Sequence, residues 1–408
     1  MSESGRSAIR LGVVTAVAAL LVVVIGALTN RIDTTTFSWD FRYYINLAEQ
    51  GFSAPSASPF AYRYLTPFLA RAIDVALGLQ TAGGFGVLAY GAAILQLVAI
   101  YAFALWYGRS TRGAWFAMLV AAFSLLQVKF LLFDPYRPDH LAYPLILLQT
   151  YFALTGRFTP LLISTMIGCQ IREFNAIPLL AYLYADLRVA EAVSTESRRR
   201  QTSDMVIGIA GLAVALLVPR MLIPVVEDFQ FVSLTRDGIM RAVLAPFVLA
   251  RDANFIYTTL AYGLPLLMLA SPREWIGQWL GLQAQDRMYL GAYTVIVLIF
   301  SFLGGTDFFR FATYLLVPQS VILAGLAARR TWLHLGLIVA AVFAFNRIWL
   351  QIPTYDQDAY LDFYSGYGSR FNSASLMRIA ECAALIAAGY LMRKLLQQGS
   401  RRDASAGP

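Results

Sequence analysis

Residues 131–150 read LLFDPYRPDHLAYPLILLQT and place three charged side chains and a histidine between two strongly apolar runs. The charges belong to Asp134, Arg137 and Asp139, and the histidine is His140. A carboxylate can take a proton from a hydroxyl group, and the planar guanidinium of arginine fits a pair of phosphate oxygens. These residue types therefore suit a reaction in which a hydroxyl attacks and a phosphate departs.

Four further polar segments interrupt apolar stretches in the same way. They are SWDFRYY (38–44), AYRYLTP (61–67), CQIREFNAIP (169–178) and GGTDFFRFATYLL (304–316). Charged side chains beside a bilayer are costly unless they face a cavity or a partner, so the segments are candidates for one shared site. The ionisable residues selected from all five are Asp40, Arg63, Asp134, Arg137, Asp139, His140, Arg172, Glu173, Asp307 and Arg310.

Structural roles are the alternative for several of these groups. Asp134 and Asp139 could cap the helix that follows them. Arg172 and Glu173 are adjacent and could form a local ion pair at a helix break. Lys129, near one end of an apolar run, is expected to extend its ammonium group toward water. The location of many such groups on one membrane face is the stronger argument for function.

The chain as a whole is too apolar for a soluble protein. Of its 408 residues, 58% are apolar and 14% are charged, whereas soluble domains average about 45–50% and about 25%. The net charge of +8 does not indicate a nucleic-acid partner, because the basic residues are scattered at helix ends. Cys169 and Cys382 lie in apolar segments, so no disulfide framework is expected. We predict an all-α, polytopic membrane protein.

A membrane-spanning helix needs about 20 mostly apolar residues. The N-terminal run is long for a signal peptide and lacks a convincing small-x-small cleavage site, which indicates a retained first span. We predict about ten to twelve spans, several of them short, from the candidates 9–28, 84–106, 113–132, 140–155, 158–171, 174–187, 205–224, 255–270, 288–304, 310–328, 331–349 and 376–393.

Two segments of the first outer loop are not counted as spans. YRYLTPFLARAIDVALGL (62–79) carries Arg63, Arg71 and Asp74, which would be costly at the bilayer centre. This segment and FRYYINLAEQGF (41–52) are predicted to be amphipathic helices that lie in the outer interface.

Arginine and lysine in short loops predict the orientation. Arg6 and Arg10 precede the first span and place the N-terminus in the cytoplasm. Alternation then puts the C-terminus and the basic loops on the same side, and the five polar segments on the extracytoplasmic side. We predict one transmembrane domain over 1–396 and a disordered cytoplasmic tail over 397–408.

The order of these elements resembles the GT-C superfamily of polyprenyl-phosphate-sugar-dependent glycosyltransferases. The resemblance rests on a single first span followed by WDFRYYINLAEQGF, YRYLTPFLA and FDPYRPDH. It covers 8–190, and 204–396 would add further spans. It implies a membrane glycosyltransferase with an extracytoplasmic site, a polyprenyl-phosphate-linked sugar as donor, and a lipid, glycan or protein acceptor.

The resemblance also implies roles for the selected residues. Asp40, in the first outer loop, would be the general base. Donor phosphate would be bound by Arg63, Arg172 and Arg310, with His140 as a helper, and the donor or acceptor would be oriented by Asp134, Arg137, Asp139, Glu173 and Asp307. The first loop has a lone aspartate in place of a paired Asp-x-Asp, so no metal and no other cofactor is expected.

Two other functions fit a polytopic membrane protein. A transporter or lipid flippase would carry ionisable residues near the bilayer midplane and often inverted repeats. Here Glu381 is the main charge within a span, and no internal repeat is evident. A ligase or polymerase of lipid-linked glycans would share the site face and the donor class, and would differ in using a donor that carries a sugar chain.

Overall fold

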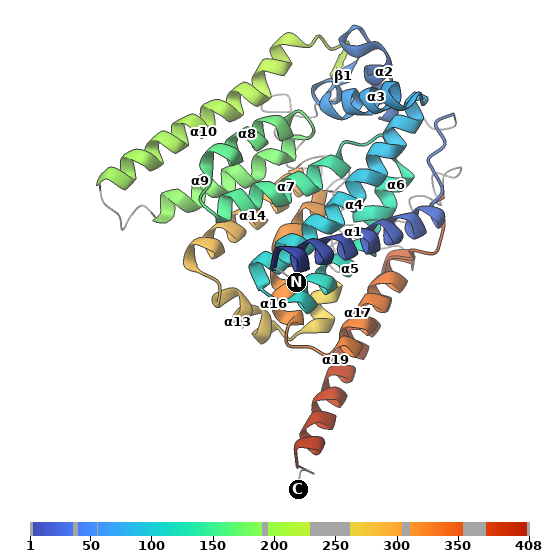
Figure 1. The fold of residues 1–408 in the computed structure, drawn as a ribbon, viewed down its shortest axis with the longest axis vertical. Coiled ribbons are helices and arrows are strands. Elements are labelled where there is room, and N and C mark those ends of the chain that lie inside the picture. The colour runs from blue at the N-terminus through green and yellow to red at the C-terminus, as the bar shows by residue number, and fades with distance from the viewer. Residues whose placement is uncertain are drawn as a thin grey trace.

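The computed structural model describes residues 3–35, 40–54, 56–189, 195–228, 262–303, 311–353 and 373–405. Within these ranges the chain is almost entirely helical, which confirms the predicted all-α class (Figure 1). Asp307 and Arg310 lie outside the described residues.

The N-terminal part of the chain contains two long apolar helices and two short helices between them. Helix α1 (Glu3–Ala27) packs against α4 (Thr81–Gly108). Between them lie α2 (Phe41–Gln50) and α3 (Leu65–Leu77), at the positions predicted for the two interfacial helices. Figure 1 shows α2 and α3 together at one end of the molecule, beside the strand β1 (Ala57–Ser58).

The predicted span 113–132 is broken. Helix α5 (Thr111–Ala122) ends before Ser124, whose backbone is extended, and a π-helical turn (Leu125–Lys129) then leads into α6 (Phe130–Phe133). The two parts are bent by 66°. The hydropathy of the sequence does not indicate this break, because the residues on both sides of it are apolar.

Lys129, at the end of that turn, does not reach toward water. Its side chain is fully buried, and its Nζ donates to the backbone oxygens of Ile348, at 2.6 Å, and of Leu350. The prediction that Lys129 snorkels is therefore wrong, because carbonyl groups of a distant segment satisfy the ammonium group inside the protein.

Shorter helices follow in the middle of the chain. They are α7 (Asp139–Leu154), α8 (Phe158–Cys169), a 3₁₀ turn (Glu173–Ala176) and α9 (Ile177–Val189), and the long α10 (Thr195–Leu222) comes after them. At about 1.5 Å per residue, the 12 residues of α8 extend about 18 Å, against about 30 Å for the apolar core of a bilayer. Helix α8 alone is therefore too short to cross a membrane.

Strand β2 (Glu227–Asp228) follows α10 and pairs in parallel with β1, with Ala57 opposite Glu227. This short pairing joins the end of α10 to the segment between α2 and α3.

The C-terminal part contains α13 (Pro272–Leu280), α14 (Ala284–Leu303), a 3₁₀ turn (Thr313–Leu315), α16 (Leu316–Ala327), α17 (Trp332–Phe345) and α19 (Ser373–Ser405). Helix α19 extends away from the bundle at the end opposite α2 and α3 (Figure 1). The helix assignment continues through Ser405, and the disorder of the tail 397–408 stays a prediction. Its arginines and alanines are compatible with helix, although its composition is polar.

Membrane character is visible in the lengths and compositions of the described helices. Three are long and apolar enough to cross a bilayer: Ile9–Ala27, Thr81–Gly108 and Arg199–Leu222. The bent pair of Thr111–Ala122 and Leu125–Phe133 would be a fourth span if it is counted as one. The larger number of spans that the sequence suggests stays a prediction.

Gly84 allows α3 to lie directly on the first turns of α4. A Cβ atom at this position would come within 2.3 Å of the Ala70 backbone oxygen in α3. Neither backbone can yield without moving a helix. This close approach fixes α3, and with it the segment of Arg63 that leads into α3.

We expect Gly84→Ala to lower the free energy of unfolding by about 1–3 kcal/mol, as overpacking does in well-packed cores. Gly91→Ala, in the same helix, is the matched control because no atom lies within 4 Å of its Cβ position. That change should stabilise the protein by about 0.5–1 kcal/mol, since alanine is the better helix former. Thermal unfolding of both variants in detergent, followed by circular dichroism, measures the difference. Equal unfolding temperatures would contradict the close approach.

Candidate functional site

Two ion pairs, one partly buried and one fully buried, join segments that are far apart in the sequence. Arg63, between a 3₁₀ turn (Phe60–Tyr62) and α3, contacts Glu173, with 3.1 Å between Nε and Oε2. Arg172 contacts Asp139, the first residue of α7, with 3.4 Å between Nη1 and Oδ2. The side chains of Arg172 and Asp139 are 2% and 0% exposed. The adjacent Arg172 and Glu173 thus bind separate partners instead of each other.

Two tyrosines complete these pairs. The Arg63 guanidinium donates to the Tyr44 hydroxyl at 3.1 Å, and the Tyr314 hydroxyl donates to Asp139 Oδ1 at 3.2 Å. Both tyrosines are buried. The sequence analysis did not select them, although each lies in one of the polar segments, because a tyrosine in an apolar context is ordinarily a packing or interface residue.

Arg172 is the most enclosed cation of the cluster. Its guanidinium carbon lies 5.8 Å from the ring centroid of Phe174 and 5.4 Å from that of Phe311. Its Nε has no hydrogen-bond partner among the residues described. One N–H donor of Arg172 is therefore buried without a partner among the described residues.

The loop before α7 contributes a third pair. Arg137 Nε lies 2.5 Å from Asp134 Oδ2, and both side chains are buried. Asp134 is the C-cap residue of α6, and the N-cap residue of α7 is Pro138, so neither aspartate is the N-cap of the helix that follows. Burial raises the pKa of Asp134, while Arg137 opposes the rise and Asp40 adds to it.

Asp40 stands at the start of α2, half-buried, and its side chain makes no capping hydrogen bond. Its charge acts on Asp134 and also on Tyr44, whose pKa is raised by burial, lowered by Arg63 and Arg172, and raised by Asp40. Tyr44 is therefore within electrostatic reach of both arginines and of Asp40. Arg63 contacts this ring's hydroxyl directly, while Asp40 and Arg172 act on it through their charges.

His140 is fully buried in the first turn of α7, beside Asp139 and the backbone of Arg137. This placement brings His140 into the same cluster. Its helper role toward a phosphate stays a prediction.

Arg220 is a further cation at this end of the molecule. It lies in the last turn of α10, with its guanidinium carbon 4.7 Å from the ring centroid of Tyr62, the neighbour of Arg63. The sequence analysis did not select Arg220. Its position near the predicted outer end of the span 205–224 could have marked Arg220 as a candidate site residue.

Glu173 is held in its ionised form. Burial alone would raise its pKa, but Arg63 and Arg172 outweigh burial and lower the pKa below its ordinary value. Arg63 has a raised pKa because Glu173 and Tyr44 outweigh the effect of its burial. The pair is therefore charged at neutral pH.

A depressed carboxyl pKa in the folded state predicts a loss of stability in acid. The contribution of Glu173 is present above its unfolded pKa of about 4.3 and is lost as the pH falls through the lower folded pKa. Asp134, whose pKa is raised, has the opposite sign and offsets part of the loss. Unfolding temperatures of the wild type and of Glu173→Gln, measured from about pH 7 to about pH 3, separate the two contributions. The variant should be less stable at pH 7 and less sensitive to acid; parallel curves would contradict the assignment.

Among the residues described, no group of three His, Cys, Asp or Glu side chains is close enough to hold a metal ion. The arrangement consists of buried arginines and carboxylates with tyrosine hydroxyls between them.

No protein-family model, curated protein or solved structure matches this chain significantly. The fold and the site define a helical protein of membrane character with a buried arginine–carboxylate cluster at one end.

Proposed function

We propose that this chain is a GT-C-like membrane glycosyltransferase, which moves a sugar from a polyprenyl-phosphate donor to a hydroxyl group of an acceptor at the extracytoplasmic face. The observation that carries the proposal is the convergence of Arg63, Glu173, Arg172 and Asp139 on one buried cluster, with Tyr44 linking them to Asp40. Burying charges is costly, and ionisable groups in perturbed environments cluster at functional sites.

Arg63 and Arg172 are proposed to bind the donor phosphate. A guanidinium has five N–H donors, and Arg63 uses Nε for Glu173 and Nη1 for Tyr44. By this count Arg63 keeps N–H groups for a phosphate oxygen, and Arg172 Nε has no hydrogen-bond partner among the described residues. Glu173 and Asp139 are proposed to orient the guanidinium groups of Arg63 and Arg172.

The proposed reaction is a single displacement. The acceptor oxygen forms a bond to the anomeric carbon while the bond from that carbon to the phosphate oxygen breaks. The Asp40 carboxylate takes the hydroxyl proton, and polyprenyl phosphate leaves with the bonding electron pair. The sugar carbon is inverted. Arginines that bind the leaving group more tightly as its charge develops lower the barrier.

A lipid-borne donor fits the position of the cluster. Tyr44 belongs to α2 and Arg63 directly precedes α3, and the β1–β2 pairing joins the end of the long apolar α10 to the segment between these helices. Nucleotide sugars are not expected outside the cytoplasm, so a donor on the outer face would be carried by the membrane.

Transport is less well supported by the charges within the helices. Glu381 of α19 pairs with Arg347, 3.0 Å from Nη2 to Oε2, and Lys129 is satisfied by backbone oxygens. These groups serve the packing of helices and do not form a polar path. A ligase or polymerase of lipid-linked glycans remains the nearer alternative because it would use the same cluster.

The test is an assay with purified protein in phospholipid vesicles. Polyprenyl-phosphate monosaccharides with radiolabelled sugars are supplied one at a time, with membrane extracts as acceptor, and free polyprenyl phosphate is quantified. Protein-dependent release coupled to label transfer supports the proposal. Transfer only from donors that carry a sugar chain would identify the ligase or polymerase, and movement of intact lipid without release would identify a flippase.

A further inference from the structure

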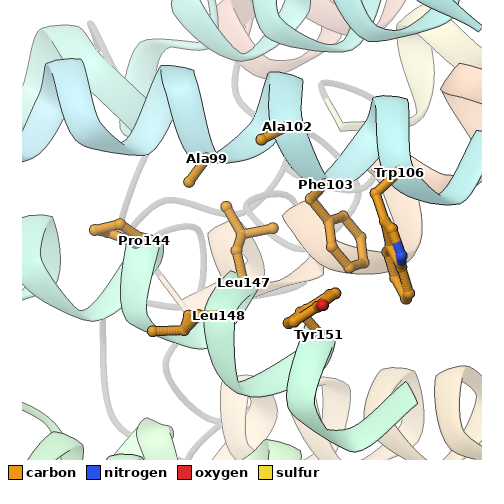
Figure 2. A pocket seen from close by; sticks show the side chains of 8 residues that line it. All are labelled: Ala99, Ala102, Phe103, Trp106, Pro144, Leu147, Leu148 and Tyr151. Carbon is orange, nitrogen blue, oxygen red and sulfur yellow. The ribbon is translucent and has the colours of Figure 1, made fainter. Parts of the chain in front are cut away.

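An apolar pocket lies between α4 and α7 (Figure 2), and none of its lining residues belongs to the arginine–carboxylate cluster. Its volume is about 330 Å³, at the small end of the range of about 300–1,000 Å³ for ligand pockets. Helix α4 contributes one wall and α7 the other, through Ala99, Ala102, Phe103, Trp106, Pro144, Leu147, Leu148 and Tyr151.

The sequence explains why this space is empty of protein. Ala99 and Ala102 have side chains too small to reach α7, and Pro144 interrupts the regular hydrogen bonding of α7 opposite them. Leu148 and Trp106 are 45% and 39% exposed, so the pocket opens on the outer surface of the bundle. On a helix long and apolar enough to span a bilayer, this surface faces lipid tails.

Basic residues mark one end of the pocket. Arg157 is exposed, and its guanidinium carbon lies 5.6 Å from the ring centroid of Tyr151, a lining residue. Its backbone N–H donates to Phe152 O at 2.8 Å, which folds the chain back over the end of α7. Arg109 caps the end of α4, one turn beyond Trp106, and is also exposed. No carboxylate among the described residues pairs with either guanidinium.

We propose that this pocket binds one anionic glycerophospholipid, with an acyl chain between α4 and α7 and the phosphate at Arg157 and Arg109. The apolar lining matches the chain, and the two cations match the charge of the headgroup. Trp106 and Tyr151 form a T-shaped pair, 4.8 Å between ring centroids, where the chain would meet the headgroup. Aromatic rings with a polar edge favour that depth in a membrane.

The proposed site belongs to the membrane face that the basic loops mark as cytoplasmic. Anionic lipids on that face attract basic side chains, and each charge contributes about a fivefold preference. The site is independent of the proposed reaction, because it uses none of the residues of the arginine–carboxylate cluster.

Native mass spectrometry of the full chain in detergent tests the proposal, with phosphatidylglycerol and phosphatidylcholine of the same acyl chains as probes. We expect one phosphatidylglycerol per chain, retained more than about tenfold over phosphatidylcholine. Arg157→Gln should reduce the preference about fivefold while lipid still binds. Ala102→Trp should fill the pocket and remove both lipids.

Leu95→Trp is the matched control, because Leu95 lies on the same helix, is 55% exposed and does not line the pocket. It should retain phosphatidylglycerol as the wild type does. Helicity and unfolding temperature confirm that each variant folds. Equal retention of the two lipids by the wild type, or unchanged retention by Ala102→Trp, would overturn the proposal. The proposal would also be overturned if the wild type is a dimer and Ala102→Trp is a monomer. The pocket would then be a contact surface between two copies of the chain.

Discussion

Arg172→Met is expected to lower the free energy of unfolding by about 3–5 kcal/mol, the usual cost of removing one partner of a buried ion pair. The Arg172 side chain is 2% exposed and that of Asp139 is 0% exposed, so water cannot solvate the carboxylate that remains. The Tyr314 hydroxyl still donates to Asp139, but one neutral hydrogen bond does not replace a cation. Chemical denaturation in mixed micelles, followed by circular dichroism, measures the loss.

The double variant Arg172→Met, Asp139→Asn separates a stranded charge from lost packing. Removing the carboxylate's charge should recover a large part of the stability, because the neutral amide needs no cation. Arg287→Met is the control for arginine removal, since among the described residues the Arg287 guanidinium donates to the Leu280 backbone oxygen, in an exposed part of α14. It should cost no more than about 1.5 kcal/mol. A double variant as unstable as the single one would show that Asp139 is not the partner that matters.

The helices were largely predictable because burial and the bilayer impose the same apolar composition on them. Runs such as 84–106 and 331–349 became α4 and α17 with ends displaced by only a few residues. The break within 113–132 was not predictable. It depends on the extended backbone at Ser124 and on carbonyl groups of a segment more than 200 residues later, which hold Lys129.

The candidate site was predictable as a set of segments and not as a set of pairs. The prediction that polar residues between apolar runs share a membrane face selected Arg63, Arg172 and Glu173. The partners of these residues depend on how the helices cross, which no spacing in the sequence encodes. Arg172 had an adjacent carboxylate and instead binds Asp139, because the turn after α8 directs neighbouring side chains to different helices.

Asp40→Asn is expected to reduce the rate of sugar transfer by about 10²–10⁴-fold, the usual contribution of a general base. The substitution keeps the size of the side chain and removes its proton affinity. It should leave the fold intact, because the Asp40 side chain makes no capping hydrogen bond at the start of α2. Binding of the donor should be little changed, since the phosphate is proposed to bind Arg63 and Arg172. The expected loss is therefore in kcat and not in KM.

Asp33→Asn is the matched control, because Asp33 precedes the same helix, is half-buried like Asp40, and accepts from the backbone N–H and hydroxyl of Thr35. Transfer by this variant should equal that of the wild type. Asp134 is the rival base, and the double variant Asp134→Asn, Arg137→Gln removes it without stranding its cation. If the double variant transfers no sugar while Asp40→Asn is nearly fully active, Asp134 is the base that takes the proton of the acceptor hydroxyl. In that case the raised pKa of Asp134, caused by its burial, would be part of the mechanism, because a carboxyl group with a higher pKa is the stronger base.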